Sequence, residues 1–352
     1  MTFGPNHYVP VLKIKLGEKA ALTLLGASQR ARITPLLEVV ERADRTLDRN
    51  VHTTFVKLAA SASLYSRFFL DVHELAADGP AAAHMVFATA QAQGLFFTPI
   101  VRISHPAIAA AAVGYRGHGI ALRLRREEFE AGDLGLRVTA FLAEHGISPG
   151  EVDLIVDLGG VEDLIQVGIA GLATAFLDEI PHHLAWRTLT VSSCSFPRGM
   201  GRVERLSHDV VERADWLTWR DRLHAGRRQL ARLPTFSDCG IQHPAGVEGF
   251  NPRIMAVSAV VRYALAESWL LIKGQSTRVV PPSAQFPNLA TRLVYGHLQS
   301  HFAGAGHCVG CRGIKNAADG ATGYGSAGVW RRLGTIHHVA TVLDGLDSLD
   351  WS

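Results

Sequence analysis

The chain has 352 residues, of which 47% are hydrophobic and 19% are charged, and its formal net charge is +3. This composition excludes a disordered or fibrous chain and allows a large core. So small a net charge gives no support to non-specific nucleic-acid binding. Four cysteines are too few for a disulfide scaffold. We therefore expect a cytoplasmic protein with neither a signal peptide nor a membrane span.

Short apolar runs along the chain predict eight β-strands, separated by segments of helical character. Strands alternating with helices predict βαβ units and a parallel sheet. Eight units in about 250 residues favour an α/β (β/α)8 TIM-like barrel over an open sheet. The predicted strands are 8–15, 32–40, 67–75, 96–104, 119–127, 153–160, 188–197 and 235–244, and the predicted helices are 17–28, 80–94, 105–117, 133–146, 162–180 and 214–233.

The strand–helix alternation stops after residue 250. Residues 255–275 predict a β-hairpin, with a single helix as the alternative, and 286–302 predict a helix. The Gly-rich segment 303–328 predicts a long loop or a short ordered insert, and 329–346 a strand or a helix. We expect one domain over residues 1–352: the barrel in 7–250 and 285–352, the hairpin insert in 251–284 and the loop in 303–328.

Each predicted strand carries an ionisable or nucleophilic side chain near its C-terminal end. In a parallel barrel these ends meet at one mouth, where such folds hold their active sites. Carboxylates there can act as general bases or Mg²⁺ ligands, and cations can hold an anion. Salt bridges lining the mouth are the alternative. The candidate catalytic residues are Lys13, Glu38, Asp71, Asp157 and Asp238, and the candidate ligand-binding residues at strand ends are Lys15, Arg102, Arg123 and Ser193.

Two other places in the sequence are candidates for ligand contact. Arg262 and Tyr263 of the predicted hairpin could reach a ligand, or could be ordinary cross-strand residues. His337 and His338 are adjacent, and in a strand they would point to opposite faces, so at most one would face a site. No Walker A, dinucleotide-binding, HExxH or EF-hand pattern is present, which weakens the classes of function those motifs mark.

Cys308 and Cys311 have the two-residue spacing of half a zinc site, with His307 beside them and His301 nearby. Cys194 and Cys239 could complete a four-thiolate set if their loops reached the pair. A redox pair is a further alternative. We favour two free cysteines in a Gly-rich loop and assign no metal ligand. Zinc is therefore not expected, and Mg²⁺ at the mouth is the cofactor left open.

Segments in the same order along nearly the whole chain resemble the "beta protein" family, named after a bacteriophage protein and widespread in bacterial genomes. The most specific are YVPVLKIKLGE (8–18) and WRRLGTIHH (330–338). The resemblance implies a link to phage–host conflict. Cys239 stands where many relatives have an aromatic residue, and the Cys308–Cys311 pair is not a family hallmark. The residues that the resemblance emphasises are Lys13, Lys15, Glu18, Glu38, Asp157, Asp238, Arg262, Tyr263, Gly274, Trp330, Arg331, His337 and His338.

These observations lead to two hypotheses of different class. In the first, the barrel mouth binds an anionic, phosphorylated or nucleotide-like ligand, and the protein is a phosphoester hydrolase or transferase linked to phage–host conflict. In the second, it is a non-catalytic scaffold or sensor subunit of an anti-phage defence or toxin-type assembly, with a protein partner such as a nuclease from the same operon. A nucleic-acid-binding role for the basic segment 220–232 is disfavoured, since a solvated helix face explains it.

Overall fold

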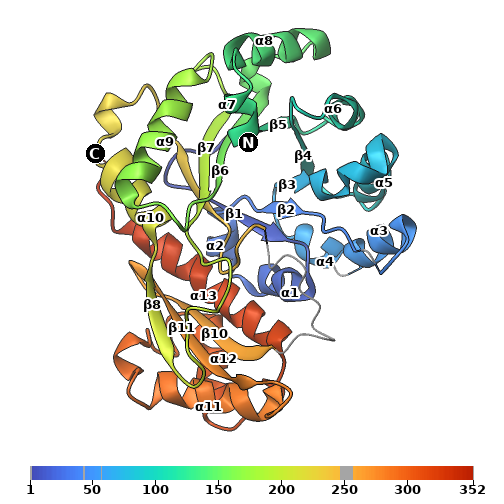
Figure 1. The fold of residues 1–352 in the computed structure, drawn as a ribbon. Coiled ribbons are helices and arrows are strands. Elements are labelled where there is room, and N and C mark those ends of the chain that lie inside the picture. Colours follow the sequence, from blue (N-terminus) through green and yellow to red (C-terminus); the bar gives the residue numbers. More distant parts are fainter. Residues whose placement is uncertain (1, 43, 57, 246–256, 352) are drawn as a thin grey trace. The chain divides into compact units, whose positions relative to one another are not determined.

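The computed structural model describes residues 2–42, 44–56, 58–245 and 257–351 (Figure 1). Its contacts group the chain into two compact units, each built from three stretches of sequence. The first unit comprises Met1–Lys15, Arg30–Cys194 and Asp215–Cys239, and the second comprises Leu16–Gln29, Ser195–Ala214 and Gly240–Ser352.

The first unit contains a closed barrel of eight parallel strands in the order β1-β2-β3-β4-β5-β6-β7-β9. Closure occurs because β9 pairs with both β1 and β7. This confirms the predicted TIM-like barrel, and each predicted strand overlaps one barrel strand. The strands are β1 (Tyr8–Lys13), β2 (Leu36–Glu38), β3 (Phe68–Asp71), β4 (Phe97–Val101), β5 (Ile120–Arg125), β6 (Val152–Gly160), β7 (Thr188–Cys194) and β9 (Thr235–Asp238).

The barrel strands are apolar on both faces because helices cover the outside while side chains fill the inside. Every residue of β3, β4, β7 and β9 is buried. The helices after the strands include α3 (Leu47–Phe55), α4 (Leu58–Ala62), η1 (His73–Asp78), α5 (Gly79–Ala92), α6 (Pro106–Val113), α7 (Arg126–Glu130), α8 (Leu134–His145), η2 (Pro149–Glu151), α9 (Gln166–Glu179), α10 (Ala214–Thr218), the π-helical η3 (Trp219–His224) and η4 (Arg227–Gln229). The single helix predicted over 214–233 is thus three short pieces.

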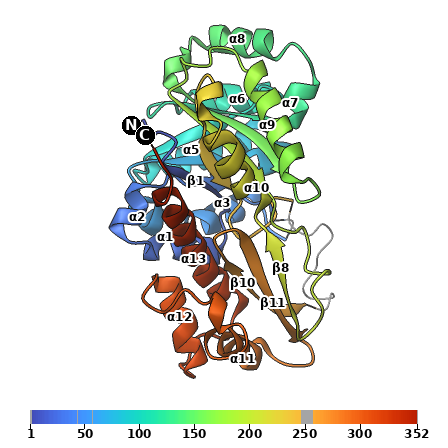
Figure 2. The same ribbon diagram turned by 90° about the vertical axis from the view of Figure 1, so that its left-hand side faces the viewer.

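The second unit contains a three-stranded antiparallel sheet in the order β10-β11-β8. The hairpin of β10 (Ser258–Ala264) and β11 (Ser268–Ser276) is as predicted, whereas β8 (His208–Glu212) was not predicted. The long helix α13 packs on α1, α12 and β10. The helices of this unit are α1 (Leu16–Leu24), α11 (Pro282–Val294), η5 (Gln299–His301), α12 (Val309–Ala318) and α13 (Ala327–Asp347), with α2 (Ala27–Ala31) shared between the units (Figure 2).

The grouping differs from the predicted domain boundaries in three ways. Two compact units are present where one domain was expected, and residues 285–352 belong to the second unit instead of the barrel. The segment 303–328 is not a loop throughout, since it contains α12. Residues 329–346 are helical, so His337 and His338 are not on opposite faces of a strand: both are buried. Residues 251–256 of the predicted insert lie outside the described residues.

Among the helices that the structure describes, none is both long enough and apolar enough to cross a membrane.

Candidate functional site

Charged side chains from the C-terminal ends of the barrel strands converge at one mouth, as the strand pattern predicted. At the centre lies Arg123 of β5, which is 2% exposed. Its Nη1 donates to Glu38 Oε1 at 2.8 Å and to Asp71 Oδ2 at 2.7 Å. Its Nε and Nη2 lie 2.9 and 2.7 Å from Asp157 Oδ2. One guanidinium therefore ties β5 to β2, β3 and β6.

Three further cations surround the carboxylates that Arg123 joins. Lys13 of β1 forms ion pairs with Glu38, at 3.7 Å, and with Glu74 of η1. Arg102, just after β4, lies 3.6 Å from Asp71 Oδ2. Arg125 lies 3.4 Å from Asp157 Oδ2, and its side chain is 32% exposed. We call these eight residues the mouth network: Lys13, Glu38, Asp71, Glu74, Arg102, Arg123, Arg125 and Asp157.

The mutual fields of these charges keep the network ionised despite burial. Burial alone would raise the pKa of Asp71, but His73, Arg102 and Arg123 together hold it well below its usual range. The pKa of Asp157 is lowered against burial chiefly by Arg123 and Arg125. Burial would lower the pKa of Arg123, yet Asp157, Glu38 and Asp71 hold it well above its usual range. Asp71, Asp157 and Arg123 are therefore charged at neutral pH.

A histidine that the sequence analysis did not select completes the mouth. His73 begins η1, two residues after Asp71, and its Nδ1 lies 2.6 Å from Asp71 Oδ1. A carboxylate only accepts, so Nδ1 carries a proton, and in the neutral form of the ring Nε2 bears the lone pair. The backbone N–H of His73 also donates to Asp71 Oδ1, at 2.9 Å. The Asp-x-His spacing within the predicted strand 67–75 was the available signal.

Several buried polar atoms in this part of the barrel have no hydrogen-bond partner among the described residues. His73 Nε2 and Arg102 Nε are two of them, and both residues contact the same carboxylate, Asp71. The hydroxyls of Thr190, Ser192 and Ser237 on the neighbouring strands β7 and β9 are also unpaired. Buried polar groups are normally satisfied, so the unpartnered nitrogens of His73 and Arg102 beside Asp71 call for an explanation.

Three other predicted mouth residues have different surroundings. Ser193 lines a small, mainly apolar cavity with Ile169 of α9 and Trp219 of η3, on the helical side of β7. Alternation along the strand therefore directs its neighbours Ser192 and Cys194 inward. Asp238 accepts a hydrogen bond of 2.5 Å from the Tyr8 hydroxyl. Lys15 follows β1 by two residues, at the boundary of the first unit.

The remaining predicted ligand-binding residues, Arg262, Tyr263, Arg331 and His337, belong to the second unit. Arg331 Nη1 donates to Gln242 Oε1 at 2.5 Å and lies 3.3 Å from Glu18 Oε1. Arg262 Nη1 donates to the Ile241 carbonyl at 2.9 Å. Burial, reinforced by Arg331, lowers the pKa of Arg262 to about 10. These contacts of Arg262 and Arg331 are made within the second unit.

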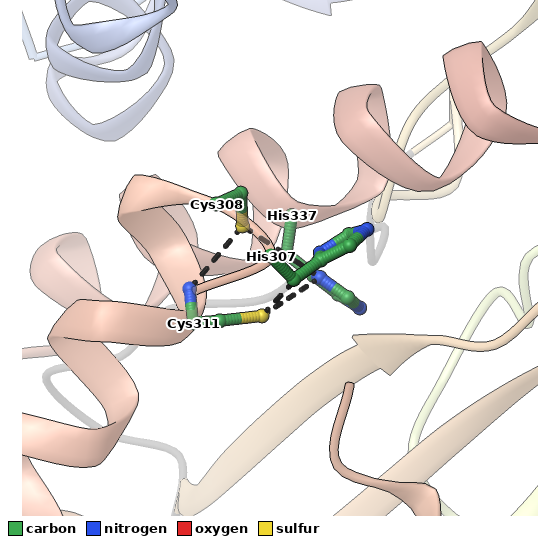
Figure 3. Close-up of side chains that lie close together, drawn as sticks. All are labelled: His307, Cys308, Cys311 and His337. Atoms are coloured by element: carbon green, nitrogen blue, oxygen red, sulfur yellow. Dashed lines mark hydrogen bonds between the residues drawn. The ribbon is translucent and has the colours of Figure 1, made fainter. Parts of the chain in front are cut away.

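Tyr263 and His337 belong to a separate cluster in that unit. One donor atom from each of His307, Cys308, Cys311 and His337 lies within 4.8 Å of the others (Figure 3). The prediction of two free cysteines in a loop is not what the structure shows. Helix α12 starts at Val309, and both cysteines lie toward α13. Cys194 and Cys239 lie in the first unit and do not complete this set.

Comparison with known proteins gives a family and a distant structural similarity. The model of the family described as Beta protein matches residues 8–344. No curated protein matches the sequence. Among solved structures, the mandelate racemase/muconate lactonizing protein from Herpetosiphon aurantiacus is similar at a TM-score of 0.31 and 12% identity. The match covers 76% of this chain and 63% of that chain, which is less than two thirds of the neighbour's length.

Proposed function

This chain belongs to the Beta protein family, whose model spans residues 8–344, and we propose that it binds a phosphate-bearing ligand at the barrel mouth. The observation that carries the proposal is a pair of unpartnered buried nitrogens beside Asp71: Nε of Arg102, which is a donor, and Nε2 of His73, which is an acceptor in the neutral ring. A guanidinium offers phosphate a planar set of donors, and mouths of parallel barrels commonly hold phosphate. Arg125, partly exposed at the same mouth, supplies further positive charge.

The reaction that we propose is phosphoester hydrolysis, with His73 as the base. The carboxylates predicted as bases, Glu38, Asp71 and Asp157, are each engaged by Arg123 and are poor proton acceptors while so paired. Asp71 instead orients His73 through Nδ1, which leaves Nε2 to take a proton from an attacking water. Arg102 would stabilise negative charge on the phosphoryl oxygens.

The network gives less support to Mg²⁺ than the sequence did. Three carboxylates that could ligate a hard cation already converge on the guanidinium of Arg123. The guanidinium lies where a metal ion would lie, and it neutralises the same negative charge. A phosphate held by arginines requires no metal for charge neutralisation, so the proposal assigns the electrostatic role to Arg102 and Arg125.

A second candidate is a non-catalytic ligand sensor or scaffold in an anti-phage assembly, with a protein partner such as a nuclease. The observation that favours it is the internal balance of the mouth network, in which each carboxylate is paired with at least one cation. Such a network can hold a ligand without turning it over. The two candidates share the binding step and differ in whether His73 moves a proton.

Calorimetric titration with inorganic phosphate and hydrolysis of p-nitrophenyl phosphate and its diester test both candidates. Arg102→Gln is expected to weaken phosphate binding by at least about tenfold, because it removes a charge-assisted hydrogen bond. The matched control Arg116→Gln, at an exposed position of the same unit, should leave binding unchanged. His73→Asn keeps a donor toward Asp71 but lacks Nε2, so binding should persist while turnover falls by about 10²–10⁴.

The outcomes separate the candidates. Phosphate binding with hydrolysis that depends on His73 supports the enzyme, and binding without hydrolysis of either probe supports the sensor. Unmodified protein that binds neither phosphate nor either ester overturns the proposed function in both forms.

A further inference from the structure

We propose that the second unit contains a structural Zn²⁺ site whose ligands are His307, Cys308, Cys311 and His337. This site is independent of the function proposed for the barrel. Two thiolates and two imidazoles form one of the usual ligand sets of structural zinc, and the Cys-x-x-Cys spacing is that of one half of such sites. Soft sulfur donors favour zinc over Mg²⁺ or Ca²⁺. Two thiolates also cancel the charge of Zn²⁺, as a buried site requires.

The distances between the donor atoms fit a single tetrahedral ion. Bonds of about 2.3 Å to sulfur and about 2.0–2.1 Å to nitrogen place tetrahedral sulfur and nitrogen ligands about 3.6 Å apart. Here Cys311 Sγ lies 3.2 Å from His337 Nδ1 and 3.7 Å from His307 Nδ1. Cys308 Sγ lies 3.8 Å from His337 Nδ1. The side chains from α12, α13 and the residue before Cys308 point toward one common centre (Figure 3).

Each histidine is oriented so that Nδ1 is free to bind a metal. His337 Nε2 lies 2.8 Å from the Ala264 carbonyl, an acceptor, so the ring proton is on Nε2 and the lone pair on Nδ1. His307 Nε2 lies 2.6 Å from Asp344 Oδ2, which fixes the same tautomer. Histidines that ligate metals typically donate their other N–H to a carbonyl or carboxylate in this way.

The sulfurs have the surroundings of thiolates. The backbone N–H of Cys311 donates to Cys308 Sγ at 3.3 Å, since Cys308 caps the start of α12. The Tyr263 hydroxyl accepts from the Ala303 N–H at 3.0 Å, which leaves its own proton for Cys311 Sγ at 3.4 Å. Both bonds stabilise negative charge on sulfur. Two uncharged thiols would need neither the N–H···S hydrogen bond to Cys308 nor the O–H···S hydrogen bond to Cys311.

The cluster is closed, which indicates a structural role. Cys311 and His337 are 0% and 1% exposed, and the Tyr263 ring stacks on His337 with centroids 3.8 Å apart. Catalytic zinc sites keep one position open for water, whereas four protein ligands fill the tetrahedron here. The ion would fasten the start of α12 to the middle of α13, in a segment otherwise rich in glycine.

Metal analysis of the full chain tests the site directly. Protein produced in zinc-supplemented medium and purified under reducing conditions without chelator should contain about one zinc per chain. Cys311→Ser should lower the zinc content to less than about a tenth, while Cys239→Ser, at a buried cysteine outside the cluster, should retain it. Replacement with Co²⁺ should give the intense visible bands of tetrahedral cobalt with sulfur ligands.

A second variant tests the site without replacing a buried residue, in case Cys311→Ser fails to fold. Asp344→Asn changes a side chain that is 64% exposed and touches only the outer nitrogen of His307. It should weaken zinc affinity about 10–100-fold in a chelator competition. Asp347→Asn, at an exposed position on the same helix, should not.

Three results would overturn the site. They are unmodified protein that neither contains zinc nor takes up Zn²⁺ or Co²⁺, zinc retained by Cys311→Ser, and a Cys308–Cys311 disulfide in the freshly purified protein.

Discussion

Arg123 is a buried cation held between three carboxylates, and this makes its side chain costly to remove. Replacement by alanine leaves Glu38, Asp71 and Asp157 buried without their central counter-charge. Breaking a buried ion pair by removing one partner typically costs about 3–5 kcal/mol. We therefore expect Arg123→Ala to lower the free energy of unfolding of the barrel by about that amount, measured by urea denaturation.

Arg125 provides the matched control for this prediction. It lies on the same strand and contacts the same Asp157, but at 3.4 Å and with a side chain that is 32% exposed. Solvent screens such a pair, so Arg125→Gln should cost no more than about 1 kcal/mol. Equal losses for the two variants would mean that the network does not hold the strands together.

At this scale the sequence located the mouth residues but not all of their partners. Arg123, Asp71 and Asp157 were predictable because a charge at the end of an apolar strand needs a partner at the mouth. Ser193 lies on the helical side of β7 because the alternation of this strand directs Ser192 and Cys194 inward, and its role in ligand binding stays a prediction. His73 was missed because it lies in η1, just beyond the strand whose end carries Asp71.

The elements of the second unit depend on close approach between helices α12 and α13. Gly310, in the first turn of α12, lies against α13: a Cβ there would meet the Leu333 carbonyl and would be 3.1 Å from the His337 nitrogen. Both are backbone atoms, which cannot move aside as a flexible side chain can. The glycine is therefore what lets the Cys-x-x-Cys turn reach His337.

We expect Gly310→Ala to destabilise the second unit by about 1–3 kcal/mol, the usual cost of overpacking. Thermal unfolding followed by circular dichroism measures the effect. Gly328→Ala is the control, since a Cβ there would have only an ordinary contact, 4.0 Å from the Ser326 hydroxyl oxygen. That substitution should be neutral or stabilise by up to about 1 kcal/mol because alanine favours a helix. An unchanged melting temperature for Gly310→Ala would refute the close-packing argument.

For the molecule as a whole, the mouth network predicts how stability varies with pH. The pKa values of Asp71 and Asp157 are depressed in the folded state. Their contribution is therefore fully present above the unfolded pKa of about 3.9 and is lost as pH falls through the depressed values. The unfolded chain binds more protons in that range, so acid favours unfolding.

We expect the free energy of unfolding to fall steadily between about pH 5 and pH 3. Asp71→Asn carries no such titratable group, so its curve should fall less steeply over the same range, even if the variant is less stable at neutral pH. Denaturant unfolding at a series of pH values checks the two slopes. Parallel curves would show that Asp71 has no depressed pKa in the folded protein.

The sequence by itself indicated the parallel α/β architecture, because strands that are apolar on both faces and alternate with helices are covered by helices on both sides or closed into a barrel, and eight units in about 250 residues favoured the closed form. It also indicated that Arg123, Asp71 and Asp157 lie near one mouth, since parallel strands end at the same edge. Only the tertiary structure decided the pairing of Asp71 with His73 and the assembly of His307, Cys308, Cys311 and His337. Cys311 and Cys308 meet a histidine 26 and 29 positions away, and His73 lies in a turn just past its strand, so no local periodicity records these contacts.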